Sequence, residues 1–166
     1  MNPVSYDGKK HPALVQHLES LGHIIVQRDA NWLSTAPQAV IDNFTPADAK
    51  PYLKKAIEKH AADIRASHFE KIDSYERDSW ETKRAQAVAF NISGMDADAP
   101  MLAAEALVRG IATSVVVARV LANSTAYQDK IGAISGREGR FKDRIDAATT
   151  WLAINNAMSV LENNWP

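Results

Sequence analysis

The sequence predicts a mainly α-helical protein with a small N-terminal segment that contains both helix and strand. Three observations support this fold class. Glycine and proline together make up 14 of the 166 residues, about 8%, against a usual share of roughly 12%. Alanine is abundant from Ala85 onward. Apolar residues recur every three or four positions from residue 46 almost to the end, which is the spacing of one helix face.

The N-terminal 44 residues predict short elements, because glycines and prolines interrupt them. We expect a helix from Pro12 to about Leu21, ended by Gly22 in the left-handed conformation. The run 23–27 is β-branched and apolar and predicts a strand, with residues 32–34 as its hairpin partner after a turn at 28–31.

Two helix starts follow this strand pair. Ser34 or Thr35 is expected to cap a short helix that begins near Pro37 and runs to about residue 44. The sequence Thr45-Pro46-Ala47-Asp48 combines a hydroxyl cap, a first-turn proline and an acid in the first turn. It predicts a longer helix over residues 46–73.

Two further helices are expected after a polar stretch at 73–77. Asp78 and Glu81 have the spacing of a capping box, which predicts a helix from Asp78 to Gly94. Asp98 is expected to cap a short helix that starts at Pro100 and ends at Gly110.

From Thr113 the helical pattern runs without proline until residue 166, which allows one long helix or a helix pair. We expect a break near residues 135–139. Gly132, Gly136 and Gly139 each cost about 1 kcal/mol relative to alanine inside a helix. These glycines follow no strand and lack a phosphate-loop lysine, so they indicate a turn or close helix packing and not a nucleotide site.

Composition excludes several classes of site. The chain has no cysteine, so disulfides, thiolate metal sites and cysteine nucleophiles are absent. The net charge of -1 provides no general attraction for nucleic acid or for an anionic membrane. No window approaches the roughly 18 apolar residues of a membrane span, and residues 1–10 lack the apolar run of a leader. We therefore expect no nucleic-acid partner and no membrane partner.

No catalytic, cofactor or metal site is predicted. Neither a serine-histidine-aspartate arrangement with an elbow motif nor a His-Glu-x-x-His motif occurs. His60 and His68 lie eight residues apart on one helical face with Asp63 between them in the chain, but the i, i+4 histidine pair of a metal site is missing. They form the basis of an alternative hypothesis, a small cytosolic enzyme or regulator with its site on the 46–73 helix.

The stretch from about residue 79 to residue 148 resembles a family of small tail proteins and tail-fibre assembly proteins of tailed bacteriophages and prophages. The resemblance depends on the order and spacing of several segments, which are SWETKRAQAVAF (79–90), DADAPML (96–102), ALVRG (106–110), VARVLAN (117–123), Ala126-Tyr127, Gly132, Gly136-Arg137 and IDAA (145–148). The chain departs from the family at residues 83–86, Lys-Arg-Ala-Gln, where Gln or Glu-Ala-Glu is more usual.

The resemblance implies helical hairpins, no catalytic residues, and a tail-fibre assembly chaperone or a small virion component of the fibre or baseplate. It also implies assembly in the host cytoplasm, with the virion tail as a second location. Residues 79–166 would form the tail-protein module and residues 45–78 a connecting helix. Residues 1–44, which match no member of the family, would serve attachment or specificity.

The partner is expected to be a tail-fibre or baseplate protein, and the sequence leaves open whether copies of the chain also associate. Large aromatic and aliphatic side chains on helices carry interface energy. We predict partner contacts at Trp80, Arg84, Leu121, Tyr127, Ile131, Phe141 and Trp151.

Overall fold

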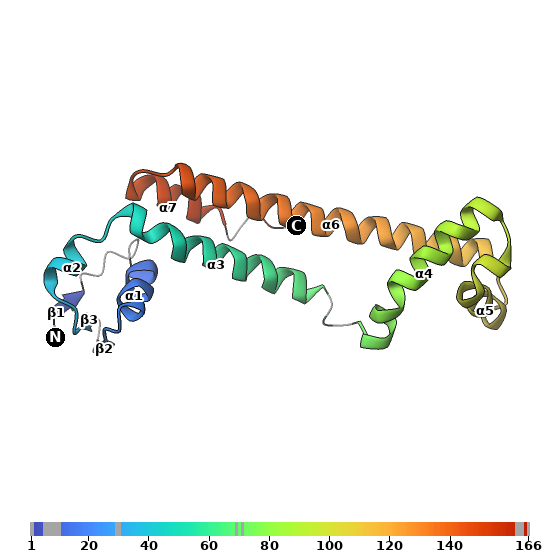
Figure 1. Cartoon of the computed structure of the whole chain (residues 1–166), viewed down its shortest axis with the longest axis horizontal. Coiled ribbons are helices and arrows are strands. Elements are labelled where there is room, and N and C mark those ends of the chain that lie inside the picture. The colour runs from blue at the N-terminus through green and yellow to red at the C-terminus, as the bar shows by residue number, and fades with distance from the viewer. Residues whose placement is uncertain are drawn as a thin grey trace. The chain divides into compact units, whose positions relative to one another are not determined.

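The predicted fold class is confirmed by a computed structural model, which describes residues 2–4, 11–28, 31–68, 70, 72–161 and 165. The described residues form seven α-helices, one short 3-10 helix and a three-stranded sheet at the N-terminal side (Figure 1). The chain divides into two compact units. Unit 1 comprises residues 1–64 and 134–166, and unit 2 comprises residues 65–133. The predicted segments 1–44, 45–78 and 79–166 do not coincide with these units.

The sheet confirms the predicted hairpin and adds a strand. Strands β2 (Ile25–Arg28) and β3 (Asn31–Ser34) pair antiparallel, with Val26 opposite Leu33. The predicted strand starts two residues later than expected, and residues 29 and 30 of the turn lie outside the described residues. Strand β1 (Asn2–Val4) pairs with the other edge of β3 and is too short to give a periodic signal.

The first two helices confirm one predicted terminus and correct another. Helix α1 (His11–Ser20) is followed by Gly22 in the left-handed conformation, with φ of 81°. Helix α2 (Gln38–Asp42) has Pro37 as its N-cap, so the predicted cap by Ser34 or Thr35 is wrong. Both hydroxyls have other partners, since Ser34 Oγ accepts from the Ala36 amide at 3.0 Å and Thr35 Oγ1 accepts from the Ile24 amide at 3.0 Å.

Helix α3 (Pro46–Ser67) begins at the predicted capping sequence. The Thr45 amide donates to Asp48 Oδ2 at 2.9 Å, the Thr45 hydroxyl donates to the same oxygen at 2.6 Å, and the Asp48 amide reaches Thr45 Oγ1 at 3.4 Å. This reciprocal arrangement is a capping box. The helix ends at Ser67 and not at residue 73 as expected.

Removing the Asp48 carboxylate is expected to destabilise the protein by about 1 kcal/mol at neutral pH. The hydrogen bonds from the Thr45 side chain and amide hold the pKa of Asp48 below its ordinary value of 3.8. Because the pKa is lower in the folded state, the Asp48 carboxylate stabilises the fold at pH values above its ordinary pKa. This stabilisation is lost as the pH falls through the folded-state pKa. Urea denaturation of wild type and Asp48→Asn should therefore differ at pH 7 and converge as the pH falls below the folded-state pKa of Asp48.

Asp78→Asn is the matched control for this prediction, because no hydrogen bond of the Asp78 side chain occurs among the described residues. It should leave the free energy of unfolding unchanged at neutral and at low pH. An equal loss in the two variants would contradict the assigned capping role of Asp48.

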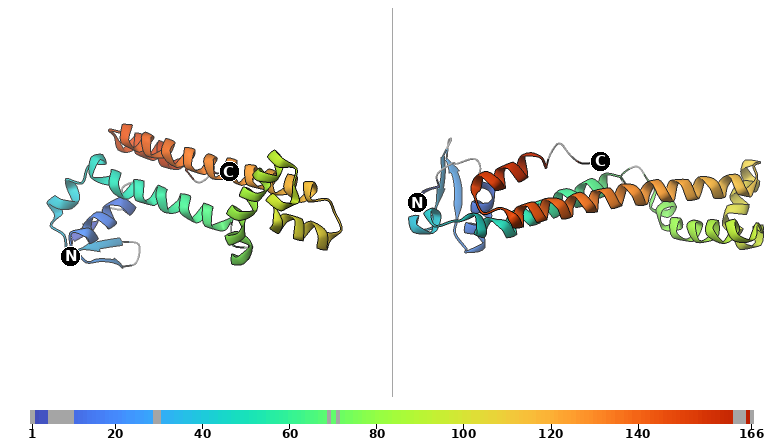
Figure 2. Two further views of the ribbon diagram at one scale, coloured as in Figure 1. Left: turned by 45° about the vertical axis from the view of Figure 1, so that its right-hand side comes forward. Right: turned by 90° about the horizontal axis from the view of Figure 1, so that it is seen from above.

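In unit 1, α3 packs antiparallel to the C-terminal part of α6 (Thr113–Ala147), as Figures 1 and 2 show. Two ion pairs fix the register, Lys54 with Asp146 at 2.9 Å and Lys142 with Glu58 at 2.8 Å. From the first ion pair to the second, the residue number increases by four in α3 and decreases by four in α6, as antiparallel helices require.

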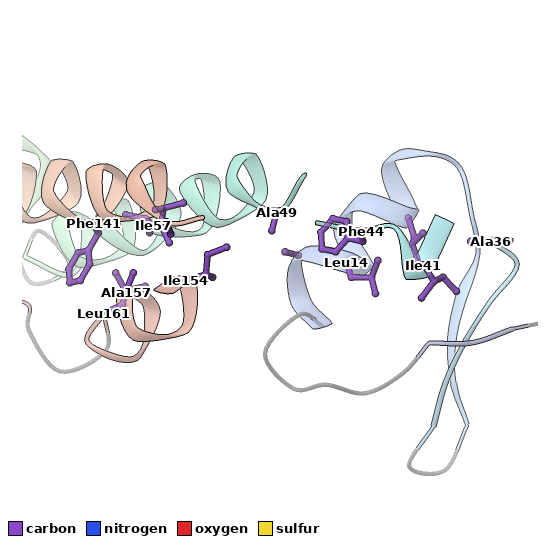
Figure 3. Close-up of a cluster of buried hydrophobic side chains, with 14 residues drawn as sticks. Leu14, Ala36, Ile41, Phe44, Ala49, Ile57, Phe141, Ile154, Ala157 and Leu161 are labelled. Carbon is purple, nitrogen blue, oxygen red and sulfur yellow. The ribbon is translucent and has the colours of Figure 1, made fainter. Parts of the chain in front are cut away.

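The core of unit 1 lies along this helix pair and continues beneath α1 and α2. Figure 3 shows Ile57 of α3, Phe141 of α6 and Ile154 of α7 (Trp151–Ser159) gathered together, and Leu14 of α1 close to Phe44. The helix α7 was not predicted as a separate element. It starts after Thr150, whose Oγ1 accepts from the Ala153 amide at 3.2 Å.

Helix α6 is continuous through its glycines, so the predicted break near residues 135–139 is wrong. At about 1.5 Å per residue its 35 residues extend about 52 Å. A Cβ atom added at Gly132, Gly136 or Gly139 would meet no neighbouring atom within 4 Å. The glycines therefore serve neither a turn nor a close contact between helices within the described residues.

Unit 2 contains α4 (Ser74–Ser93), the 3-10 helix η1 (Asp96–Asp98), α5 (Pro100–Arg109) and the N-terminal part of α6. The predicted start of α4 at Asp78 is wrong by one turn, because Asp73 Oδ1 accepts from the Tyr75 amide at 2.8 Å and caps the helix. Gly94 and Gly110 end α4 and α5 with φ of 71° and 64°, as predicted.

The predicted cap of α5 by Asp98 is also wrong. Ala99 is the N-cap residue of α5 and provides no side-chain hydrogen bond. Instead Gln86 of α4 accepts from the Met101 amide through Oε1 at 2.9 Å. The free amide at the start of α5 is thus satisfied by a neighbouring helix, which local sequence could not indicate.

Tyr52 of α3 connects to α1 through two hydrogen bonds. Its hydroxyl lies 3.2 Å from His17 Nδ1 and 2.9 Å from Ser20 Oγ. The Ser20 hydroxyl donates to the His17 carbonyl at 2.7 Å, so Tyr52 donates to Ser20 Oγ. The remaining contact then has His17 Nδ1–H donating to the tyrosine oxygen.

Tyr52→Phe is expected to lower the free energy of unfolding by about 1 kcal/mol, because it removes both bonds between α1 and α3. Urea denaturation measures the change. Tyr75→Phe is the control, since Tyr75 is 85% exposed and the same atom is removed. Equal stability of the two variants would show that the hydrogen bonds to Tyr52 add nothing.

Candidate partner-binding site

The seven residues predicted to contact a partner lie in both units. Phe141 and Trp151 belong to the core of unit 1, where Phe141 is 4% exposed and the Trp151 ring centroid lies 5.7 Å from that of Phe44. These two side chains therefore pack within the chain itself. Leu121 packs against the core of unit 2, and Ile131 is half-buried outside both cores.

Trp80, Arg84 and Tyr127 are brought together in unit 2. They line a cavity of about 900 Å³, the groove of unit 2, which is formed by α4, α5 and α6. The rings of Trp80 and Tyr127 meet edge to face with centroids 5.6 Å apart. Val116 and Val120 of α6 add an aliphatic surface to the same groove.

One side of this groove is a chain of ion pairs that joins α4 to α5. Lys83 Nζ lies 3.0 Å from Glu76 and 3.5 Å from Glu105, and Arg109 lies 2.7 Å from Glu105. Lys83 therefore lies between two carboxylates, and Glu105 lies between two cations. This arrangement holds α4 and α5 in a fixed register.

The pKa shifts of the two central groups follow from this chain. Burial lowers the pKa of Lys83, but the hydrogen bonds and charges of Glu76 and Glu105 outweigh it and raise the pKa above its ordinary value. The hydrogen bond from Arg109, with the charge and hydrogen bond of Lys83, lowers the pKa of Glu105 despite partial burial. Both groups are therefore charged at neutral pH.

Two cations in the groove have no such partner. Arg84 and Arg119 line it, and among the described residues no ion pair joins either guanidinium to a carboxylate. Glu81 is the one lining carboxylate for which the described residues show no hydrogen bond or ion pair. The carboxylate of Asp73, which also lines the groove, accepts the capping bond of α4.

The sequence revealed part of this groove. Trp80 and Arg84 are four residues apart on α4, a spacing that places both on one face. Arg119, Val116 and Val120 were not predicted, although their spacing with Tyr127 matches a face of α6. The pairing of Lys83 with Glu105 depends on the packing of α4 against α5 and has no local signal.

The alternative site at His60, Asp63 and His68 gains no support from the described residues. Asp63 pairs with Lys59 on the surface at 2.7 Å, and the His60 ring contacts Trp165 with centroids 5.3 Å apart. None of the three residues lines the groove of unit 2 or the second cavity, of about 440 Å³, near α5. No group of three metal-ligating side chains occurs in the described part of the chain.

Unit 2 also exposes much apolar surface. Eight large apolar side chains of this unit are exposed, and among them Ile92, Met95, Leu107 and Val108 are between 57% and 88% exposed. We call these four residues the apolar surface of unit 2. The described core of the unit is Ala87, Ala99, Leu102, Ala106, Val116 and Val117, of which three are alanines. The unit thus exposes more large apolar side chains than it buries.

No single helix among the described residues has the length and apolarity needed to span a membrane. Helices α5 and α6 meet the criterion only as a pair, and the pair is bent by 115°. Comparison of the chain with protein-family models, curated proteins and solved structures found no match.

Proposed function

We propose that the chain is a non-enzymatic bacteriophage tail protein that acts through protein–protein contacts. In this proposal it is a tail-fibre assembly chaperone or a small structural component of the fibre or baseplate. It works in the host cytoplasm during assembly, and a structural component would remain in the virion tail. The resemblance of residues 79–148 to tail proteins supports the proposal.

The observation that carries the proposal is the apolar surface of unit 2. Covering exposed apolar side chains with a partner is favourable, because their contact with water is unfavourable. Leu107 and Val108 are 82% and 88% exposed although they lie on the short helix α5, beside a small core. A partner that covers this surface would bury what the unit itself leaves in water.

Co-expression with the product of the neighbouring fibre gene tests the proposal. Size-exclusion chromatography with light scattering should reveal a complex, and mass spectrometry of finished virions separates the two roles. A chaperone binds the fibre protein but is absent from the particle, whereas a structural component is present in fixed copy number. A chain that binds neither fibre nor baseplate protein and is absent from virions would overturn the proposal.

Substitutions on the apolar surface of unit 2 sharpen this experiment. Leu107→Glu with Val108→Glu should abolish co-purification while leaving the circular dichroism spectrum unchanged. Leu152→Glu is the matched control, because Leu152 is 65% exposed on α7 in unit 1. If the double variant binds the partner as well as the wild type does, the apolar surface of unit 2 is not part of the interface.

A further inference from the structure

We infer that the groove of unit 2 binds an acidic, apolar segment of a partner protein. An aspartate or glutamate of that segment would pair with Arg84 and Arg119, and an adjacent aromatic or aliphatic side chain would pack on Trp80 and Tyr127. This inference rests on the proposed function, because it names the chemistry of the protein partner.

The first argument is charge complementarity. The lining carboxylates of Glu76 and Glu105 are neutralised by Lys83 and Arg109 within the groove. Arg84 and Arg119 remain as exposed cations without an ion pair among the described residues, and the lining carboxylates of Asp73 and Glu81 likewise have no ion pair there. Four acids and four bases line the groove, so its lining has no net charge, and Arg84 and Arg119 are the two lining cations that have no ion pair among the described residues. A guanidinium without an ion pair suits a carboxylate of a ligand.

The second argument is the kind of side chain that carries this charge. A guanidinium offers a planar fork of donors that fits a carboxylate in two parallel hydrogen bonds. Tryptophan, tyrosine and arginine are the residue types that dominate the energy of protein interfaces. All three residue types line the groove, and the ring centroids of Trp80 and Tyr127 lie 5.6 Å apart.

The third argument concerns size and competing ligands. A cavity of about 900 Å³ has room for several side chains of a bound segment. A nucleic-acid strand would bring one phosphate charge per nucleotide toward the four lining carboxylates Asp73, Glu76, Glu81 and Glu105. A protein segment with one or two acids avoids that repulsion, so we assign the groove to protein.

The test is selection from a displayed library of random 12-residue peptides against the full chain. Peptides enriched by the wild-type chain should place aspartate or glutamate next to an aromatic or aliphatic residue. The enriched peptide is then synthesised with a fluorescent label, and its Kd is measured by anisotropy. A version with lysine in place of each acid should bind at least tenfold more weakly.

Arg84→Glu with Arg119→Glu should weaken the acidic peptide by at least tenfold and favour the lysine version. Both arginines are exposed, and neither has a hydrogen bond or an ion pair among the described residues, so the variant should fold. Arg140→Glu is the matched control, since Arg140 is exposed on α6 outside the groove, and it should bind like wild type. The inference is overturned if selection yields no acidic preference, if the double variant binds as tightly as wild type, or if a DNA oligonucleotide competes for the groove at physiological salt.

The inference about the groove and the proposed function can be refuted separately. If acidic peptides bind through Arg84 and Arg119 but fibre and baseplate proteins do not bind, the inference about the groove is supported and the proposed tail-fibre function is refuted. If a fibre protein binds the wild type and the double variant equally, the proposed tail-fibre function is supported and the inference that the groove binds the partner is refuted.

Discussion

Leu102→Ala is expected to destabilise unit 2 by about 2–5 kcal/mol, the range for a buried leucine that leaves a cavity. Leu102 is 0% exposed on α5, and its neighbours in the core of unit 2 are alanines and valines. The fully buried neighbours are short and cannot extend into the space that the leucine leaves, although larger, partly buried side chains such as Phe90 and Leu121 pack against the same core. Hydrogen exchange should show faster exchange at the amides of α4 and α5 than in wild type.

Leu107→Ala makes the same chemical change on the same helix at a side chain that is 82% exposed. We expect it to change the free energy of unfolding by less than about 0.5 kcal/mol. If the proposed function holds, this variant nevertheless loses affinity for the partner. Equal destabilisation by the two substitutions would contradict the small, densely buried core that we describe for unit 2.

Replacing Gly132, Gly136 and Gly139 together with alanine is expected to stabilise the protein by roughly 1.5–3 kcal/mol. Alanine is favoured over glycine inside a helix by about 0.5–1 kcal/mol per position, chiefly because it loses less backbone entropy on folding. The three sites lie within α6, and the added Cβ atoms meet nothing within 4 Å. Thermal and urea denaturation of the triple variant measure the gain.

Gly94→Ala and Gly110→Ala provide a control of opposite sign. These glycines have φ of 71° and 64°, where an L-residue with a Cβ is disfavoured by about 1–2 kcal/mol. The same chemical change should therefore destabilise here. A triple variant that is less stable than wild type would show that the glycines of α6 are needed in the fold.

Elements with a local chemical cause were predictable from the sequence. The Thr45/Asp48 capping box, the strand pair around Val26 and the left-handed glycines Gly94 and Gly110 all depend on residues close together in the chain. Errors arose where packing outweighs propensity. Helix α6 continues through three glycines because Ile134, Phe141 and Ile145 are buried along it.

The groove of unit 2 was predictable only in part, for a related reason. Trp80, Arg84 and Tyr127 attract attention as residue types that favour interfaces. Whether Lys83 or Arg84 is free to meet a partner depends on Glu105, which follows more than 20 residues later on another helix. Phe141 and Trp151 satisfy the same criteria as Trp80, and tertiary packing alone places them in a core.

The division of unit 1 into residues 1–64 and 134–166 has a consequence for synthesis on the ribosome. The buried face of α3, which includes Ile57, is made before Phe141 and Ile145 of α6 exist to cover it. The intervening stretch of about 70 residues takes roughly 4–14 s to translate at roughly 5–20 residues per second. During that interval the nascent chain carries an uncovered apolar helix, and the N-terminal part of unit 1 completes its core only after unit 2 has been synthesised.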